Sequence, residues 1–170
     1  MIRIGLILLL CQLGLSSNAI AQQQTVFLIR HAEKSLEPGA DPELSELGKA
    51  RALQLVNIFS PTKTAAIFTS QYRRTQQTAL PLANALGIAI TALEINKDNA
   101  KQYTALLLER ICALPDKSNV LVVGHSNSIP AIVSAWTGEQ VADIADDEYD
   151  RLYMVRLDAC HASDSLALRY

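Results

Sequence analysis

Short apolar runs recur along the chain and predict buried strands. Residues 26–29, 65–68 and 120–123 are continuous stretches of β-branched, aliphatic or aromatic side chains without polar alternation. Such runs are typical of strands at the centre of a parallel sheet, where helices cover both faces. We therefore predict three central strands at these positions.

Helical patterns separate the apolar runs. Three segments have apolar residues at helical spacing: 45–59, 72–86 and 100–114. In the first of them, Leu47, Ala50, Leu53 and Leu55 form one apolar side. Strands that alternate with helices in this way predict an α/β fold, a three-layer α/β/α sandwich with a mainly parallel central sheet.

Local signals mark where these helices begin and end. Ser45 is a suitable N-cap for the first helix, and Gly87 is a suitable stop for the second. Asn127 or Ser128 is placed to cap a further helix. Pro81 removes a backbone donor from the second helix, so we expect a kink or a break near it.

The chain becomes acidic after residue 136 and then ends in two apolar stretches. The acids, which we interpret as part of a solvated loop, are Asp143, Asp146, Asp147 and Glu148. Residues 152–157 and 166–170 predict a terminal antiparallel pair of strands.

The first 21 residues have the features of an export signal. Arg3 gives a positive start, residues 4–15 are apolar, and residues 19–21 (Ala-Ile-Ala) form a small-x-small cleavage site. The apolar stretch is shorter than the roughly 20 residues that a bilayer span needs, so we favour cleavage over a membrane anchor. We expect residues 22–170 to form one mature domain, either periplasmic or secreted, without stable membrane insertion.

Composition agrees with one globular domain, because 49% of the 170 residues are hydrophobic. The net charge of -2 and the lack of basic blocks argue against a nucleic-acid partner. Export would place Cys112 and Cys160 in an oxidising compartment, where either a disulfide or two buried thiols is possible. Their spacing does not decide between the two.

Charged side chains follow each predicted strand directly or closely. Arg30 and His31 end the first run, Arg73 and Arg74 follow the second, and His125 follows the third. Parallel α/β sheets bind ligands beyond the carboxyl ends of their strands, so these side chains are predicted to share one crevice. Desolvating several cations together is costly, and an anion is therefore the expected ligand.

Three ordered motifs carry a resemblance to a known family. "RHAE" at 30–33 resembles the Arg-His-Gly signature of the histidine phosphatase superfamily, which includes the cofactor-dependent phosphoglycerate mutases. "TSQYRRTQQTA" at 69–79 is similar to its second arginine motif, and "VLVVGHSNSIP" at 120–130 to its second histidine motif. "LSELGKARA" at 44–52 is like its first helix. The resemblance spans about residues 25–135.

The resemblance implies a role for each of these residues. His31 is the predicted nucleophile, because neutral imidazole, with an ordinary pKa of about 6.5, offers a lone pair near neutral pH. Arg30 and Arg74 would bind the phosphoryl oxygens, and the motif spacing selects Arg74 over its neighbour. His125, if protonated, would add charge to the phosphate pocket. Ser126 is a candidate phosphate donor, although helix capping explains it equally well.

The proton donor is the least determined role. Family members that use a carboxylate place it in the region of "ITALEINKD", where Glu94 is the positional match and Asp98 the alternative. Some small members lack the carboxylate, which suits leaving groups that are already good. Glu33 and Lys34 either bind substrate or brace the loop as an ion pair. His161 is predicted to lie in a surface loop.

We therefore predict a metal-independent phosphatase without a cofactor, which hydrolyses a small phosphorylated substrate through phospho-His31. Residues 87–120 leave little room for the covering segments of the mutases, and Ala32 replaces the signature glycine, so hydrolysis is favoured over phosphoryl transfer. The alternatives are a phosphohistidine or phosphoprotein phosphatase, a mutase-type phosphotransferase, and a non-catalytic phosphate-binding protein of the envelope. No Cys/His cluster has the spacing of a metal site.

Overall fold

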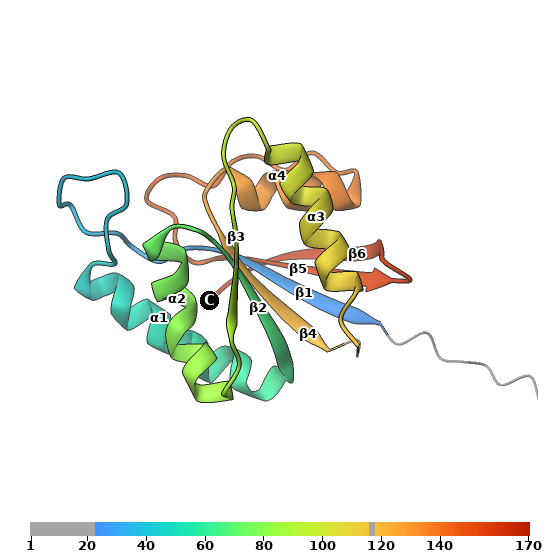
Figure 1. Ribbon diagram of the computed structural model, residues 1–170, viewed down its shortest axis with the longest axis horizontal. Coiled ribbons are helices and arrows are strands. Elements are labelled where there is room, and N and C mark those ends of the chain that lie inside the picture. The colour runs from blue at the N-terminus through green and yellow to red at the C-terminus, as the bar shows by residue number, and fades with distance from the viewer. Residues whose placement is uncertain (1–22, 116–117) are drawn as a thin grey trace, which may run out of the picture.

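A six-stranded sheet organises the computed structural model, which describes residues 23–115 and 118–170 (Figure 1). The predicted export signal, residues 1–21, lies outside the described residues. The strand order across the sheet is β3-β2-β4-β1-β5-β6. The strands are β1 (Gln24–Arg30), β2 (Thr64–Ser70), β3 (Ile90–Leu93), β4 (Asn119–Gly124), β5 (Arg151–Asp158) and β6 (His161–Arg169).

Strands β3, β2, β4 and β1 run parallel, and the three predicted central strands are confirmed as β1, β2 and β4. Strand β3 was missing from the sequence-based prediction. It pairs with β2 at the sheet edge, and its four residues are exposed or only partly buried. An edge strand does not need the continuous apolar run by which the central strands are identified.

Two helices cover each face of the sheet, which confirms the three-layer α/β/α architecture. The helices are α1 (Glu46–Phe59), α2 (Arg73–Leu86), α3 (Ala100–Cys112) and α4 (Ser128–Thr137), with a 3-10 turn at Ser60–Thr62. Leu55 of α1 and Leu82 of α2 share one buried cluster with Val123 of the sheet. Leu107 of α3 and Ile132 of α4 share the cluster on the opposite face.

The buried side of α1 includes Leu55, as predicted, but otherwise differs from the predicted side. Leu47 and Leu53 are 63% and 61% exposed, whereas Gly48, Ala52 and Leu55 face the core. The two possible faces of the helix carry similar numbers of apolar residues. The periodicity of the sequence alone therefore does not determine which face is buried. The close approach of Gly48 to the Glu33 backbone, just after β1, determines the observed face.

Helix α2 continues through Pro81 without the predicted break. Ala79, Leu82 and Ala83 on either side of the proline are buried against the sheet, and this packing offsets the backbone hydrogen bond that proline removes. The predicted stop at Gly87 is confirmed, because this residue ends the helix with a φ of +66°.

The predicted terminal pair is confirmed as the antiparallel hairpin β5–β6. His161 opens β6 rather than lying in a loop, although its side chain is exposed, as expected. A disulfide between Cys112 and Cys160, whose Cα atoms are 5.8 Å apart, joins the end of α3 to this hairpin. No helix among the described residues is long and apolar enough to cross a membrane.

Candidate active site

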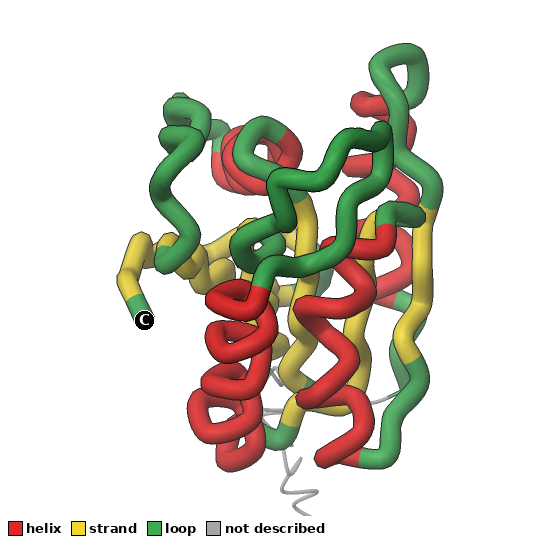
Figure 2. Tube along the Cα trace, turned by 90° about the vertical axis from the view of Figure 1, so that its left-hand side faces the viewer, coloured by secondary structure: helices red, strands yellow, loops and turns green. Residues whose placement is uncertain are grey.

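The carboxyl ends of β1, β2 and β4 meet at one end of the sheet, where the loops gather (Figure 2). The register pairs Arg30 with Gly124, and the backbone N–H of His31 donates to the Gly124 carbonyl at 2.9 Å. This pairing brings the residues that follow β1 and β4 side by side. The rings of His31 and His125 are consequently 5.4 Å apart.

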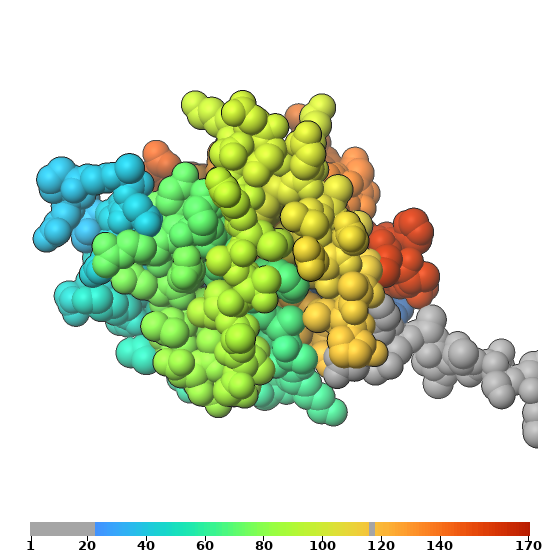
Figure 3. Space-filling view, in the orientation of Figure 1, coloured from blue at the N-terminus to red at the C-terminus, as the bar shows by residue number. Residues whose placement is uncertain are grey.

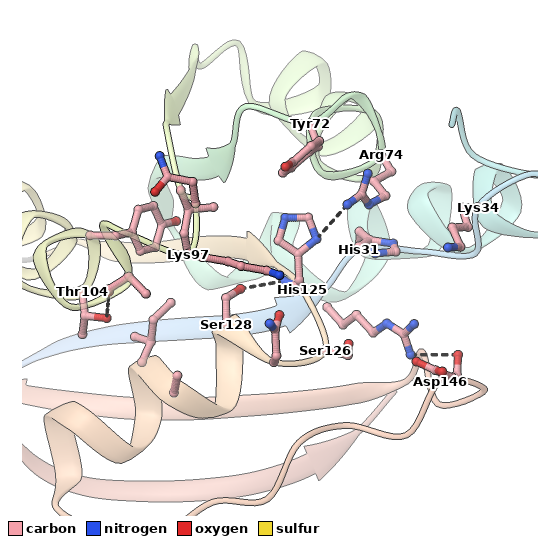
Figure 4. Close-up of a pocket in the computed structure, with 18 residues that line it drawn as sticks. His31, Lys34, Tyr72, Arg74, Lys97, Thr104, His125, Ser126, Ser128 and Asp146 are labelled. Atoms are coloured by element: carbon pink, nitrogen blue, oxygen red, sulfur yellow. Dashed lines mark hydrogen bonds between the residues drawn. The ribbon is translucent and has the colours of Figure 1, made fainter. Parts of the chain in front are cut away.

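A pocket of about 530 Å³ opens at this point (Figure 4). Arg30, His31, Arg74 and His125 all line it, together with Ser126. These are positions far apart in the sequence that the motifs predicted would converge. Lys34 and Lys97 also line the pocket, so cationic side chains predominate in it.

His31 is held as a neutral imidazole with one nitrogen available. Its side chain is buried, and Nδ1 lies 2.7 Å from the Ala32 carbonyl. A carbonyl oxygen only accepts, so Nδ1 carries the proton and Nε2 keeps its lone pair. Burial, together with the charges of Arg74 and Arg30, lowers the pKa of His31 to about 4. The ring is therefore unprotonated at neutral pH.

The segment after His31 is fixed to α1 and α2. The Ala32 N–H donates to Thr78 Oγ1 at 2.9 Å, and Glu33 receives a forked pair of bonds from Arg51. Glu33 thus braces this segment through an ion pair, but its partner is Arg51 rather than Lys34, which lines the pocket. Gly48 lies so close that a Cβ there would stand 2.1 Å from the Glu33 carbonyl oxygen. These contacts leave His31 little freedom to move.

His125 stands between a guanidinium and a hydroxyl. Arg74 Nη2 donates to His125 Nδ1 at 3.4 Å, so Nε2 carries the proton and donates to Ser70 Oγ at 2.9 Å. Ser70 in turn bonds Thr75 Oγ1 at 2.9 Å. Ser70 belongs to the second arginine motif, but the sequence alone assigned it no role. Burial, with the charge of Arg74, lowers the pKa of His125 to about 3.

Arg30 is a buried cation, only 4% exposed, that has no carboxylate partner among the described ion pairs. One of its nitrogens, Nη1, donates to the carbonyls of Ala145, Asp146 and Glu148 at 2.7, 3.0 and 2.9 Å. The guanidinium also lies 4.1 Å from the centre of the Tyr149 ring. Its Nε is buried and has no hydrogen-bond partner. An anion in the pocket would offset the charge of this guanidinium.

The two neighbouring arginines of α2 have different surroundings. The Arg74 side chain is 15% exposed, lines the pocket, and meets Asp41 at 3.4 Å. The Arg73 side chain is 57% exposed and pairs with Glu43 outside that pocket. The structure therefore places Arg74 at the site, as the motif spacing predicted, and leaves Arg73 on the surface.

The start of α4 also borders the pocket through Ser126, Asn127 and Ser128. Asn127 occupies the N-cap position, but its side chain makes no capping hydrogen bond. Ser128 Oγ instead accepts the backbone N–H of His125 at 2.9 Å, which fixes the turn that carries this histidine. Asn127 is therefore the N-cap residue, as predicted, although it makes no side-chain capping hydrogen bond. Ser126 remains available to a ligand.

The structure does not bring Glu94 to the pocket. Its side chain is exposed outside the lining, and its carbonyl accepts the Asn99 side chain at 3.1 Å. Asp98 is likewise exposed and outside the lining. Among the described residues that line the pocket, Asp146 is the one acidic residue. Residues 23–115 and 118–170 contain no cluster of three or more Asp, Glu, His or Cys side chains that could hold a metal ion.

The lowered pKa values of the two histidines predict acid sensitivity. An unfolded histidine titrates near 6.5, so below that pH the unfolded chain binds protons that the folded pocket excludes. The free energy of unfolding should thus reach its full value above about pH 6.5 and decrease as the pH falls toward 4. His31 and His125 should each lower it by up to about 1.4 kcal/mol per pH unit.

Denaturant unfolding at pH 7 and pH 5 measures this loss. His125→Gln should lose less stability over that interval than the wild type, whereas His161→Gln, on the exposed edge strand, should lose as much. An equal loss in wild type and His125→Gln would contradict the expectation.

A family model matches the part of the chain that contains the first two motifs. Residues 26–100 match the family model described as histidine phosphatase superfamily (branch 1). A search of curated proteins gave no match.

Solved structures share the fold. The protein histidine phosphatase SixA, complexed with tungstate, superposes with a TM-score of 0.71 at 18% identity, over 86% of this chain and 97% of that one. Mycobacterial glucosyl-3-phosphoglycerate phosphatase gives a TM-score of 0.67 at 15% identity, over 87% and 98%. A putative SixA from Agrobacterium tumefaciens gives 0.62 at 22% identity, over 85% and 98%.

Proposed function

We propose that this chain, a member of the histidine phosphatase superfamily, is a phosphatase that works through a covalent phosphohistidine on His31. The observation that carries the proposal is a neutral imidazole, with Nε2 available, beside a buried arginine that has no carboxylate partner. Such a site combines a nucleophile with a place for the negative charge of a phosphoryl group.

In the first step, Nε2 of His31 attacks phosphorus and the bond to the leaving-group oxygen breaks. The electron pair of that bond goes to the leaving group, and the phosphoryl group stays on Nε2. Arg30 and Arg74, which both line the pocket, would donate to the equatorial oxygens, where charge accumulates. Ser126 and the first amides of α4, which border the pocket, would add further donors.

His125 is neutral in the unliganded pocket, but a bound dianion changes its surroundings. The negative charge of the phosphate would offset the charge of Arg74 that helps to keep the imidazole unprotonated. Binding would therefore favour the protonated ring, which then adds a donor to the phosphate.

In the second step, water attacks the phosphohistidine, inorganic phosphate leaves, and Nε2 regains its lone pair. Hydrolysis is favoured over a mutase reaction because the segment after Gly87 forms part of the sheet and its helical layer rather than a cover over the site. Strand β3 and helix α3 account for most of it, and the pocket is bordered there by the loop at residues 95–97 and by the first turns of α3. No described segment there is free to enclose an intermediate for rebinding.

The position of Glu94 predicts which leaving groups are tolerated. A proton donor contributes about 10²–10⁴-fold, so without one the enzyme should hydrolyse aryl phosphates more than about 10²-fold faster than alkyl phosphates. Glu94→Gln should leave kcat/KM for both classes within about twofold of wild type, since its side chain lies outside the pocket. Steady-state kinetics with phenyl and ethyl phosphate measure this. A large loss on ethyl phosphate alone would restore Glu94 as the acid.

The central experiment is a quench of the protein during turnover of a ³²P-labelled aryl phosphate in the presence of EDTA. We expect acid-labile label on His31, unaffected by the chelator. Label on another residue would overturn the mechanism, and activity that EDTA removes would overturn metal independence. If phosphate raised the melting temperature but neither label nor turnover were observed, the result would favour a non-catalytic phosphate-binding protein.

A second candidate function is hydrolysis of phosphohistidine on a protein. It is favoured by the fold shared with SixA, described as a protein histidine phosphatase. The position of Glu94 and Asp98 outside the pocket lining also favours it, since a phosphoramidate needs little help to leave. Turnover of a phosphohistidine protein but not of phenyl phosphate would select it.

We also propose export, with cleavage after Ala21. The residue pattern 1–21 and the disulfide between Cys112 and Cys160 support an oxidising compartment. Amino-terminal sequencing of the mature protein tests the cleavage site.

A further inference from the structure

An apolar groove of about 410 Å³ lies between α3 and α4, on the face of the sheet opposite α1 and α2. Helix α3 is visible on the surface in Figure 3, in yellow. Most of the groove is lined by four alanines, a leucine and a tryptophan from the two helices: Ala100, Ala105, Ala131, Ala135, Leu108 and Trp136. They outnumber the polar lining residues Lys101 and Thr104.

The polar groups in this groove are already engaged. Thr104 Oγ1 donates to the Ala100 carbonyl at 3.1 Å, and Trp136 Nε1 donates to the Thr104 carbonyl at 3.4 Å. The remaining polar residue, Lys101, is exposed, so its ammonium group can stay in water while its stem lies along the groove. A sugar or another polyhydroxylated group would therefore find few partners here, whereas an apolar chain would lose none.

The groove adjoins the pocket of His31. Ala100, Thr104 and Ala131 line both. The pocket itself, at about 530 Å³, is far larger than one phosphoryl group, and its side toward α3 contains Tyr103 and Ile132. A leaving group that extends from the phosphoryl site along this side would enter the groove.

We propose that the natural substrate is an amphipathic phosphoryl compound whose leaving group carries an extended apolar chain, and that this chain lies in the α3–α4 groove. The inference rests on the proposed function and specifies its substrate class. Burying a methylene from water favours binding by up to about fourfold, so the specificity constant should rise with chain length until the groove is filled.

Phenyl, 4-ethylphenyl, 4-butylphenyl and 4-hexylphenyl phosphate test the proposal, because the alkyl group changes apolar length with little effect on the leaving-group pKa. Below the micelle-forming concentration, kcat/KM should rise about two- to fourfold per methylene over the first members, and at least about tenfold from phenyl to hexylphenyl. Ala135→Arg, which places a long cation in the groove outside the pocket lining, should reduce that ratio toward one.

The matched control is Ala85→Arg, an exposed alanine of α2 on the other face of the sheet, which should keep the wild-type ratio. Ala105→Arg, also in the groove, provides a second variant if the first does not fold. A flat series in the wild type, with phenyl phosphate still hydrolysed through labelled His31, would overturn the groove and leave the phosphatase function intact. A rising series that both groove variants retain would place the apolar site elsewhere. Loss of phenyl phosphate hydrolysis and of label in the wild type would instead contradict the function itself.

Discussion

His31→Ala is expected to reduce turnover of phenyl phosphate by at least about 10³-fold and to abolish the labelled intermediate. The substitution removes the lone pair that attacks phosphorus, whereas Arg30, Arg74 and His125 still line the pocket. Affinity for inorganic phosphate should therefore change by less than about tenfold. This separation of chemistry from binding distinguishes a nucleophile from a side chain that only holds the anion.

Steady-state kinetics and calorimetric titration with phosphate measure the two effects. His31→Gly in millimolar imidazole extends the test, because a free imidazole can occupy the vacated space and restore part of the turnover. His161→Ala is the matched control, since it removes an exposed histidine from the edge strand. Phosphate binding that disappears in parallel with turnover would contradict the nucleophile assignment and make His31 a binding residue.

The sequence was most informative where burial is complete. Strands β1, β2 and β4 are covered on both faces, so their apolar runs are continuous and the charged residues after them stand out. The rule that ligands bind at carboxyl strand ends then predicted the convergence of Arg30, His31 and His125, with Arg74 added by the motif spacing. The observed pocket contains all four.

The sequence was least informative where backbone geometry decides. The acidic loop after α4 was interpreted as solvated, yet its carbonyl oxygens at Ala145, Asp146 and Glu148 hold the buried Arg30. Backbone acceptors leave no mark in the side-chain pattern, so this role could not be predicted. Glu94 was assigned by position along the chain, which does not determine the direction of a side chain in an edge loop.

The exposed leucines of α1 illustrate a third limit. Helical periodicity identifies an apolar side but does not weigh a close backbone approach against it. Gly48 must face the segment after His31, because any side chain there would collide with the Glu33 carbonyl. That requirement turns Leu47 and Leu53 toward solvent. The contact between α1 and the segment that carries His31 therefore helps to determine which face of α1 is buried.

Arg74→Ala is expected to reduce kcat/KM for phenyl phosphate by about 10²–10³-fold, the usual effect of removing one preorganised donor from a charged transition state. The guanidinium is largely buried, lines the pocket and meets both His125 and Asp41. Its loss also removes the positive charge that helps to lower the pKa of His125, so that pKa should rise toward its ordinary value. The acid sensitivity that His125 contributes to folding should decrease accordingly.

The chain contains its own control for this prediction. Arg73→Ala removes the same charge one residue earlier, from a side chain that is 57% exposed and paired with Glu43. An exposed ion pair of this kind contributes little, so activity should stay within about threefold of wild type. Kinetics of the two variants, together with NMR titration of His125, measure both effects. Similar losses in the two variants would mean that the net charge of the pocket region, rather than one placed guanidinium, supports catalysis.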